Sequence, residues 1–215
     1  MQTVVIIDYG SGNLHSAAKA FERAARESGS GSAIVVSSNA ADVLAATRIV
    51  LPGVGAFADC KRGLDAVPGM RDALEHAVRQ KGRPFLGICV GYQALFEKSE
   101  EFNSCAPGLG IFPGKVVRFA GQGGVKIPQI GWNQLEIARP DCPLYRGIAD
   151  GSYVYFVHSY YPQPVDDTIV ATRTSYGETF ASSVWRDNVF ATQFHPEKSQ
   201  QVGLRLLRNF VDLVK

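Results

Sequence analysis

A cysteine set between two glycines has the clearest chemical potential in this chain. The stretch PFLGICVGYQALFE at 84–97 places an apolar run before Cys89 and a helix-like pattern after it, with Gly87 and Gly91 on either side. Strand, Gly-x-Cys-x-Gly turn and helix form the thiol version of the nucleophile elbow, which lifts the side chain above the carboxyl edge of a sheet. The N-terminus of the following helix would favour a thiolate. The alternative is a buried structural cysteine in a strand–helix corner.

A cysteine nucleophile needs a base, and His195 is the best placed of the four histidines. In QFHPEKS, a strand would deliver His195 to the sheet edge, and Pro196 would end that strand. Glu197 lies two residues further on, so its carboxylate can reach back and orient the imidazole. Glu197 could instead cap the last helix. The other histidines fall on predicted helices or end an aromatic strand: His15, His76 and His158.

Two backbone segments could stabilise an oxyanion formed at Cys89. The N–H of Val90, the residue after the cysteine, is placed to donate to it. The glycine-rich stretch LPGVGAF at 51–57 also lies at a predicted strand end, where its N–H groups can face a ligand. Alone this stretch would be an ordinary turn. Beside an elbow it becomes a candidate for the second oxyanion donor.

The elements that must position these residues alternate in the first half of the chain. Buried strands are predicted at 3–8, 33–37, 48–52 and 84–88, with helices at 14–26, at 57–80 (broken near Pro68-Gly69) and at 90–97. This alternation predicts a parallel sheet with helices on both faces. Aromatic and β-branched runs follow at 115–119, 152–161, 168–173, 180–185 and 189–194, before a last helix at 201–214. They predict an antiparallel C-terminal extension of the sheet.

The bulk properties agree with one α/β domain spanning 1–215, with a mainly parallel central sheet flanked by helices. The chain has 215 residues, 46% of them hydrophobic, and a formal charge of +2, which does not suggest bulk binding to nucleic acid or anionic membranes. It has no signal-peptide pattern and no apolar run long enough to span a membrane, so we expect a cytoplasmic protein.

The four cysteines form no CxxC pair and no Cys/His zinc pattern, so we expect reduced thiols, no metal and no cofactor. Cys60 falls on a predicted helix, where it would be a small buried hydrophobe. Cys105 and Cys142 are predicted loop residues without an evident role.

GICVGYQ followed by FHPE resembles the class I glutamine amidotransferases of the triad type, whose flavodoxin-like fold the resemblance implies. These two motifs mark the superfamily. The resemblance covers essentially the whole chain and is closer to one group, the glutaminase subunits of imidazole glycerol phosphate synthase. The segments that carry it are IDYGSGN, LPGVGAF, GICVGYQALFEKSEE, IPQIGWN, YFVHSYY and QFHPEKSQ. One departure is Tyr92, where members often carry Met or another aliphatic residue.

The resemblance implies a role for each matching residue. Cys89 would be the nucleophile, His195 the base and Glu197 the group that orients it. The oxyanion hole would be formed by Val90, Gly53, Val54 and Gly55. The substrate glutamine would be bound by Gln93, Glu101, Ser159 and Tyr160. The partner interface and ammonia exit would include Asn13, Trp132, Tyr155 and Lys198.

The implied reaction is hydrolysis of L-glutamine to glutamate and ammonia through a thioester on Cys89. Ammonia would be protonated in bulk water, so a protected route to a second active site is physically sensible. The chain contains no recognisable P-loop and no barrel repeats, so the site that uses the ammonia must lie on another polypeptide. The resemblance implies a 1:1 heterodimer with the (βα)8-barrel cyclase subunit, in histidine biosynthesis.

Three other interpretations stay open at this point. The chain could be the glutaminase partner of a synthase making anthranilate, aminodeoxychorismate or pyridoxal phosphate. It could be a cysteine peptidase or small-molecule hydrolase of similar architecture. It could also be a binding module that has lost its chemistry, although Cys89, His195 and Glu197 are all present.

Overall fold

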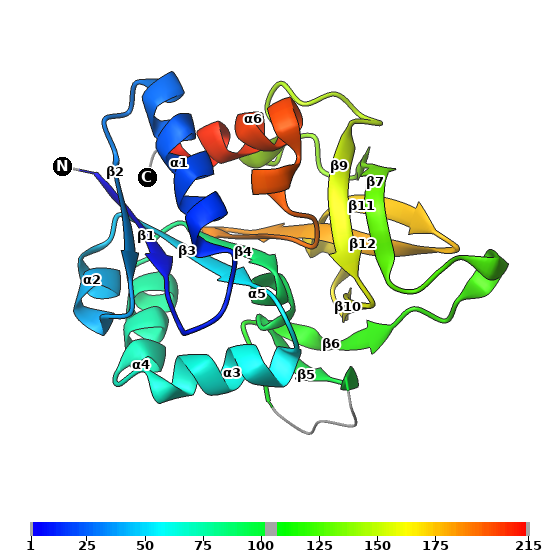
Figure 1. Ribbon diagram of the computed structural model, residues 1–215, viewed down its shortest axis with the longest axis horizontal. Coiled ribbons are helices and arrows are strands. Elements are labelled where there is room, and N and C mark those ends of the chain that lie inside the picture. Colours follow the sequence, from blue (N-terminus) through cyan, green and yellow to red (C-terminus); the bar gives the residue numbers. More distant parts are fainter. Residues whose placement is uncertain (1, 102–106, 214–215) are drawn as a thin grey trace.

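A central sheet of eight strands organises the computed structural model, which describes residues 2–101 and 107–213 (Figure 1). In spatial order its strands are β2 (Ala33–Ser37), β1 (Thr3–Ile7), β3 (Arg48–Gly53), β4 (Phe85–Cys89), β13 (Val189–Thr192), β12 (Glu178–Arg186), β11 (Val170–Tyr176) and β8 (Glu136–Ile137). The first five are parallel, in the 2-1-3-4-5 order of flavodoxin-like sheets. The last three are antiparallel. The predicted fold class and its C-terminal extension are confirmed.

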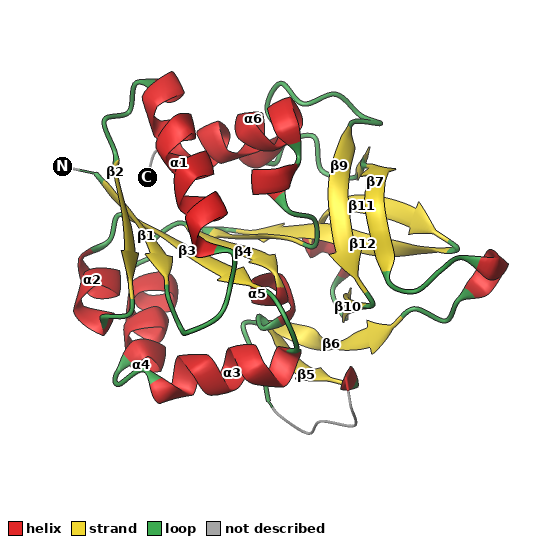
Figure 2. Ribbon diagram, viewed as in Figure 1, coloured by secondary structure: helices red, strands yellow, loops and turns green. Residues whose placement is uncertain are grey.

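Helices gather around the parallel half of the sheet, and strands dominate the other half (Figure 2). The helices are α1 (Leu14–Ser28), α2 (Ala40–Ala45), α3 (Phe57–Ala66), α4 (Met70–Leu74), which continues as a π-helix (Glu75–Gln80), and α6 (Gln200–Val211). On α1, Ala17, Phe21 and Ala24 are buried at helical spacing. The ring of Phe21 meets Phe210 of α6 with centroids 6.1 Å apart, and Phe210 lies 6.4 Å from Phe190 of β13. This contact packs α1 and α6 together on one side of the sheet.

The helix after the cysteine is much shorter than predicted. Instead of a helix over 90–97, the chain forms α5 (Val90–Gln93) and then a strand, β5 (Phe96–Ser99). The carbonyl of Leu95 accepts backbone hydrogen bonds from Ile111 and Phe112, and β5 pairs in parallel with β6 (Phe112–Arg118). Tertiary pairing therefore overrides the local helical pattern, and it leaves only about one helical turn behind Cys89.

Two small sheets carry strands that the sequence assigned to the central sheet. The run at 152–161 divides at Ser159 into β9 (Tyr153–His158) and β10 (Tyr160–Pro164). β9 pairs with β7 (Gln129–Gln134), and β10 pairs with β6. Packing of Phe156 against Phe180 of β12 and against Phe194, just after β13, with centroids 5.8 Å apart in both pairs, places β9 against the central sheet. The break places Ser159 at the junction of the two small sheets.

The remaining predictions concern single features. The helix break near Pro68-Gly69 is confirmed, because α3 ends at Ala66 and α4 begins at Met70. Cys60 is buried on α3 as expected, and Cys142 is buried in a loop. Cys105 lies outside the described residues. Within the described ranges, none of the helices is long and apolar enough to cross a membrane.

Candidate active site

Cys89 occupies a sharp turn between β4 and α5. Its φ of 55° and ψ of −109° lie where a non-glycine residue is uncommon. Such a conformation persists only when the surroundings over-determine it. β4 has β3 on one side and β13 on the other, so the strand that carries the cysteine is held from both sides. The thiol is nearly buried and lines a cavity.

The glycines around the elbow are required by close backbone approach. A Cβ on Gly91 would lie 1.9 Å from the carbonyl oxygen of Leu51 in β3. A Cβ on Gly87 would lie 2.7 Å from the Gly91 oxygen, and one on Gly53 would lie 2.5 Å from the Gly91 nitrogen. These contacts press the start of α5 against β3 and β4, as the glycine pattern predicted.

Replacing Gly91 by alanine is therefore expected to destabilise the protein by about 3 kcal/mol or more, the upper end for inserting a group into a packed interior. The free energy of unfolding in urea measures this loss. Gly82→Ala is the matched control, because Gly82 has φ +61° but a Cβ added there would meet nothing within 4 Å. The Gly82→Ala variant should lose only about 1–2 kcal/mol of unfolding free energy, which is the cost of holding a non-glycine residue in the left-handed conformation. Equal losses in both variants would contradict the close-approach explanation.

His195 and Glu197 form a buried pair at the end of β13. Nδ1 of His195 lies 2.7 Å from Oε1 of Glu197, and both side chains are almost fully buried. Nε2 of His195 makes no hydrogen bond in the described structure. Burial lowers the pKa of His195, but the charges of Cys89 and Glu197 and the hydrogen bond with Glu197 outweigh it and raise the pKa to about 10. The arrangement favours an imidazolium beside the thiol, which suits a proton donor to a leaving amine.

Ser199 anchors the His195 turn to β9, and no sequence pattern singled it out. Its Oγ donates to the His195 carbonyl at 2.7 Å and accepts from the Tyr155 N–H at 3.0 Å. The His195 N–H donates to the Tyr155 carbonyl at 3.0 Å. Three hydrogen bonds therefore hold the backbone of His195 against β9 of the neighbouring small sheet.

His158 is unsuited to act as the base. Burial lowers its pKa to about 4, so the ring is neutral near pH 7. Both ring nitrogens are already occupied: Nδ1 lies 2.9 Å from the Tyr160 carbonyl oxygen, and Nε2 lies 2.9 Å from the Gln129 side chain. These contacts make His158 a structural link between β7, β9 and β10.

A cavity of about 580 Å³ opens above Cys89. Ten of the predicted site residues line it: Val54, Gly55, Cys89, Val90, Gln93, Glu101, Ser159, Tyr160, His195 and Lys198. The other five do not line it: Asn13, Gly53, Trp132, Tyr155 and Glu197. Gly53 packs against Val90 and Gly91 of the elbow, and Glu197 pairs with His195, which does line the cavity.

Gln93 and Glu101 are fixed by hydrogen bonds to the cavity wall. Nε2 of Gln93 donates to the Tyr160 carbonyl at 3.0 Å and to Oε1 of Gln193 at 3.3 Å. Oε2 of Glu101 accepts from the Phe57 N–H at 2.6 Å. Burial raises the pKa of Glu101, and this hydrogen bond opposes the shift. A carboxylate in this position suits a cationic group of a ligand.

Gln193 is a second site residue that the motifs in the sequence did not reveal. Its Nε2 lies 3.7 Å from the Cys89 sulfur, and its side chain is buried. It lies two residues before His195, in the chain just after β13 (Val189–Thr192), and a strand prediction that reached 194 would have placed both side chains on one side by alternation. That alternation is the signal that could have identified it.

The glycine-rich segment after β3 borders the cavity through Val54 and Gly55. The Val54 carbonyl accepts from Ser11 Oγ at 3.4 Å. Gly55 has φ +85° and open space around it, whereas Gly53 is tightly packed. Close packing therefore fixes the segment at Gly53, whereas Gly55 adopts a left-handed conformation with open space beside it.

Three of the predicted interface residues form a cluster beside the cavity. The rings of Trp132 and Tyr155 are 5.9 Å apart and nearly perpendicular, and Nζ of Lys198 lies 5.9 Å from the centre of the Tyr155 ring. Asn13 lies apart from them, at the start of α1.

Tyr92 points away from the cavity. It is fully buried, its hydroxyl donates to the Ala181 carbonyl at 3.3 Å, and its ring packs edge-on against Phe96 at 5.6 Å. The departure from the family pattern therefore changes the core beneath the elbow and leaves the cavity lining unaltered.

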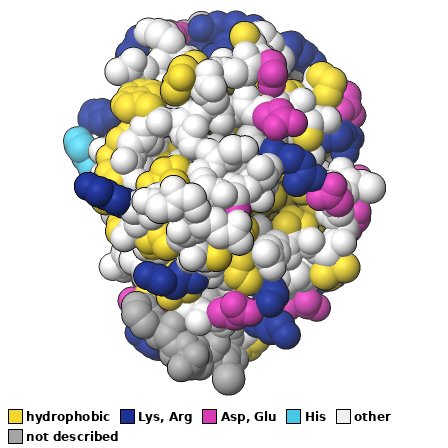
Figure 3. Space-filling view, turned by 90° about the vertical axis from the view of Figure 1, so that its right-hand side faces the viewer, with side chains coloured by type: hydrophobic (Ala, Val, Ile, Leu, Met, Phe, Trp, Pro, Cys, Tyr) yellow, Lys and Arg dark blue, Asp and Glu magenta, His cyan; other side chains and the backbone are white. Residues whose placement is uncertain are grey.

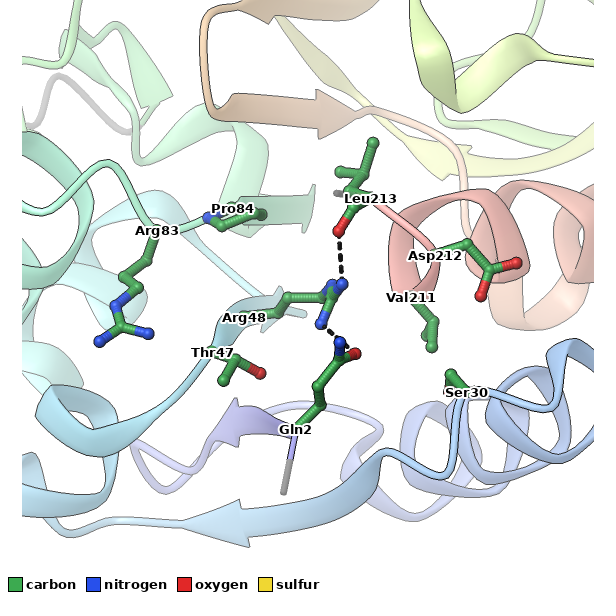
Figure 4. Close-up of a pocket in the computed structure, with 9 residues that line it drawn as sticks. All are labelled: Gln2, Ser30, Thr47, Arg48, Arg83, Pro84, Val211, Asp212 and Leu213. Atoms are coloured by element: carbon green, nitrogen blue, oxygen red, sulfur yellow. Dashed lines mark hydrogen bonds between the residues drawn. The ribbon is translucent and has the colours of Figure 1, made fainter. Parts of the chain in front are cut away.

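A second cavity, of about 420 Å³, lies at the opposite edge of the sheet and includes none of the predicted site residues (Figure 4). Its buried Arg48 donates to the Phe210 carbonyl at 3.1 Å and to Oε1 of Gln2 at 3.0 Å. A third bond goes to the Leu213 carbonyl. These bonds tie the start of β3 to the residue before β1 and to the end of α6, which is a structural role.

The chain is similar over its full length to known proteins. The family model for glutamine amidotransferase class-I matches residues 5–213. The imidazole glycerol phosphate synthase subunit HisH of Syntrophotalea carbinolica is 53% identical, over 98% of this chain and 100% of its own length. The HisH subunit of Agrobacterium fabrum is 52% identical, over 97% of each chain.

Solved structures agree in fold at much lower identity. A crystal structure described as a glutamine amidotransferase superposes with a TM-score of 0.71 at 19% identity, over 97% of each chain. A putative GMP synthase component from Thermoplasma acidophilum gives a TM-score of 0.63 at 22% identity, over 98% of this chain and 92% of its own. The chain therefore belongs to the class-I glutamine amidotransferase family and, within it, to the imidazole glycerol phosphate synthase HisH subunits.

Proposed function

We propose that this chain is the glutaminase subunit of an imidazole glycerol phosphate synthase. It hydrolyses L-glutamine to glutamate and ammonia and passes the ammonia to the cyclase subunit in histidine biosynthesis. The observation that carries the proposal is the buried pair of His195 and Glu197 beside Cys89 at one cavity, in a chain 53% identical over its length to a HisH subunit. The proposed chemistry needs no metal or cofactor.

The reaction begins when the Cys89 thiolate attacks the side-chain amide carbon of glutamine. The carbonyl oxygen becomes an oxyanion, which the N–H of Val90 and N–H groups of the Gly53–Gly55 segment stabilise. Removing one such donor costs about 3–4 kcal/mol of barrier. The open space beside Gly55 is compatible with reorientation of this segment when the partner binds.

His195 completes both halves of the reaction. As an imidazolium it gives its proton to the leaving nitrogen, so ammonia departs and a γ-glutamyl thioester remains on Cys89. The imidazole then activates water, which hydrolyses the thioester to glutamate. Glu197 holds the ring in position and stabilises its charged form.

Glutamine binds with its α-ammonium against Glu101. An ammonium beside this carboxylate offsets the burial that raises its pKa. Gln93, Ser159 and the Tyr160 backbone line the same part of the cavity.

The partner docks on the face beside β7 and β9, where large apolar side chains are exposed: Ile130 by 62%, Trp132 by 46% and Tyr153 by 54%. This end of the molecule faces the viewer in Figure 3, where apolar side chains lie among basic and acidic ones. Large exposed aromatics at a site rim are typical of protein interfaces. Ammonia leaves past Tyr155 and Lys198 into a (βα)8-barrel cyclase, in a 1:1 heterodimer. We expect the pair in the cytoplasm, where thiols stay reduced.

Trp132→Ala is expected to weaken binding of the cyclase about 30-fold, equivalent to about 2 kcal/mol, as for other aromatic anchors. Titration calorimetry with the cyclase measures it. Val165→Ala, which removes a side chain exposed by 77% elsewhere, is the control and should bind normally. The unfolding midpoint of the isolated chain should not change in either variant. Unchanged affinity in Trp132→Ala would contradict the proposed docking face.

The proposed function is tested by glutamate release from glutamine, measured with the isolated chain, with the cyclase, and with the cyclase plus its nucleotide ligand. Low activity alone and a large increase in the full complex are expected. Full activity of the isolated chain, indifferent to the cyclase and its ligand, would overturn the coupling. The leading alternative is a glutaminase of another synthase. Co-purification of a chorismate-converting enzyme instead of a barrel cyclase would favour it.

A further inference from the structure

The lining of the cavity above Cys89 includes a positively charged side chain, Arg118, that has no role in the proposed mechanism. Besides Glu101, its lining includes two positively charged side chains, Arg118 and Lys198. Lys198 belongs to the turn that follows His195, and its ammonium lies over the Tyr155 ring. Arg118 takes part in none of the ion pairs formed among the described residues. Arg118 is an exposed residue that lines the cavity, so its guanidinium is available to an anionic group bound there.

The strand register brings Arg118 to the same part of the cavity as Ser159 and Tyr160. Arg118 is the last residue of β6 and pairs with Tyr160 of β10. The next residue, Phe119, donates its N–H to the Ser159 carbonyl at 3.1 Å.

Glu101 approaches this part of the cavity from the other side of β6. β5 pairs with β6, and the Glu100 N–H donates to the Val116 carbonyl at 2.9 Å. Glu100 directly precedes Glu101, and Val116 lies two residues before Arg118. Glu101, two residues after the end of β5, and Arg118, at the end of β6, therefore both line this cavity. The thiol enters separately, from β4 of the central sheet.

We propose that Arg118 recognises the α-carboxylate of glutamine while Glu101 recognises its α-ammonium. This inference rests on the proposed glutaminase function and adds a specificity residue to it. A free amino acid carries an ammonium and a carboxylate on one carbon, which matches a carboxylate and a guanidinium side chain that line one cavity. A planar guanidinium can bind a carboxylate through two parallel hydrogen bonds. A glutamine whose α-carboxyl is esterified or in a peptide bond lacks the anion, and it leaves Arg118 without its ligand.

The test compares L-glutamine with L-glutamine α-methyl ester, using the complex with the cyclase and its ligand and measuring ammonia release. Arg118→Gln should lower kcat/KM for glutamine about tenfold, through KM, with kcat within about twofold, as expected for a charge-assisted contact at a partly exposed site. The ester should react equally well with both enzymes. The preference for the free carboxylate should therefore fall about tenfold, and Arg118→Lys should restore part of it.

Lys115→Gln is the matched control, because Lys115 lies on the same strand but pairs with Glu100 at 2.7 Å. It should keep the full preference. Retention of that preference by Arg118→Gln, or an equal loss on both substrates, would overturn the inference. Failure of the unmodified complex to hydrolyse glutamine would instead overturn the proposed function, so the two failures are distinguishable.

Discussion

Cys89→Ala is expected to lower kcat for glutamine hydrolysis by about 10⁴-fold or more, because the covalent route through the thioester is lost. Glutamate release in the presence of the cyclase and its ligand measures the effect. The fold should persist, since the change removes only a sulfur atom. Binding of glutamine should also persist, because the groups proposed to bind it are untouched.

Cys142→Ala is the matched control for the nucleophile. Cys142 is equally buried but does not line the cavity, so the variant should retain full activity. A glutamine-analogue electrophile such as diazo-oxo-norleucine should label the unmodified chain at Cys89 and leave Cys89→Ala unlabelled. Continued glutamate release by Cys89→Ala would remove the nucleophile assignment. Activity on peptides with no glutamine turnover would favour a peptidase.

Glu197→Gln is expected to lower kcat by about 10²–10⁴-fold, as when the orienting acid of a catalytic triad is neutralised. The amide keeps the size of the side chain but removes the charge that acts on Nδ1 of His195 at 2.7 Å. The neutral amide no longer stabilises the imidazolium that must protonate the leaving nitrogen. Glu136→Gln, at an exposed position on β8, should leave the rate unchanged.

The effect of Glu197→Gln on the pH dependence of kcat/KM has a defined direction. Cys89 and Glu197 raise the pKa of His195 to about 10, so the imidazolium is present at neutral pH and is lost as the pH rises through that value. Removing the carboxylate lowers the pKa of His195. The alkaline limb of the kcat/KM profile should therefore move to lower pH in Glu197→Gln. An alkaline limb that stays in place would show that Glu197 does not act on the imidazole.

The sequence by itself determined the features that depend on neighbours along the chain. The elbow could be predicted because Gly87, Cys89 and Gly91 lie within five residues. Each glycine stands where the turn leaves no room for a Cβ. The contact of His195 with Glu197 could be predicted because they are two residues apart. The alternation of strands and helices in the first half predicted a parallel sheet, because hydrophobic periodicity reports directly on the buried face of each element.

Only the tertiary structure decided features made by distant residues. Despite the helical pattern at 90–97, residues 96–99 form strand β5, because they pair with β6. The run at 152–161 broke at Ser159 because its two halves pair with different strands. Gln93 meets Gln193, and Arg118 comes to lie beside Tyr160, through contacts that leave no local pattern. Local propensities are worth about 1 kcal/mol or less per residue, so pairing and burial between distant segments outweigh them.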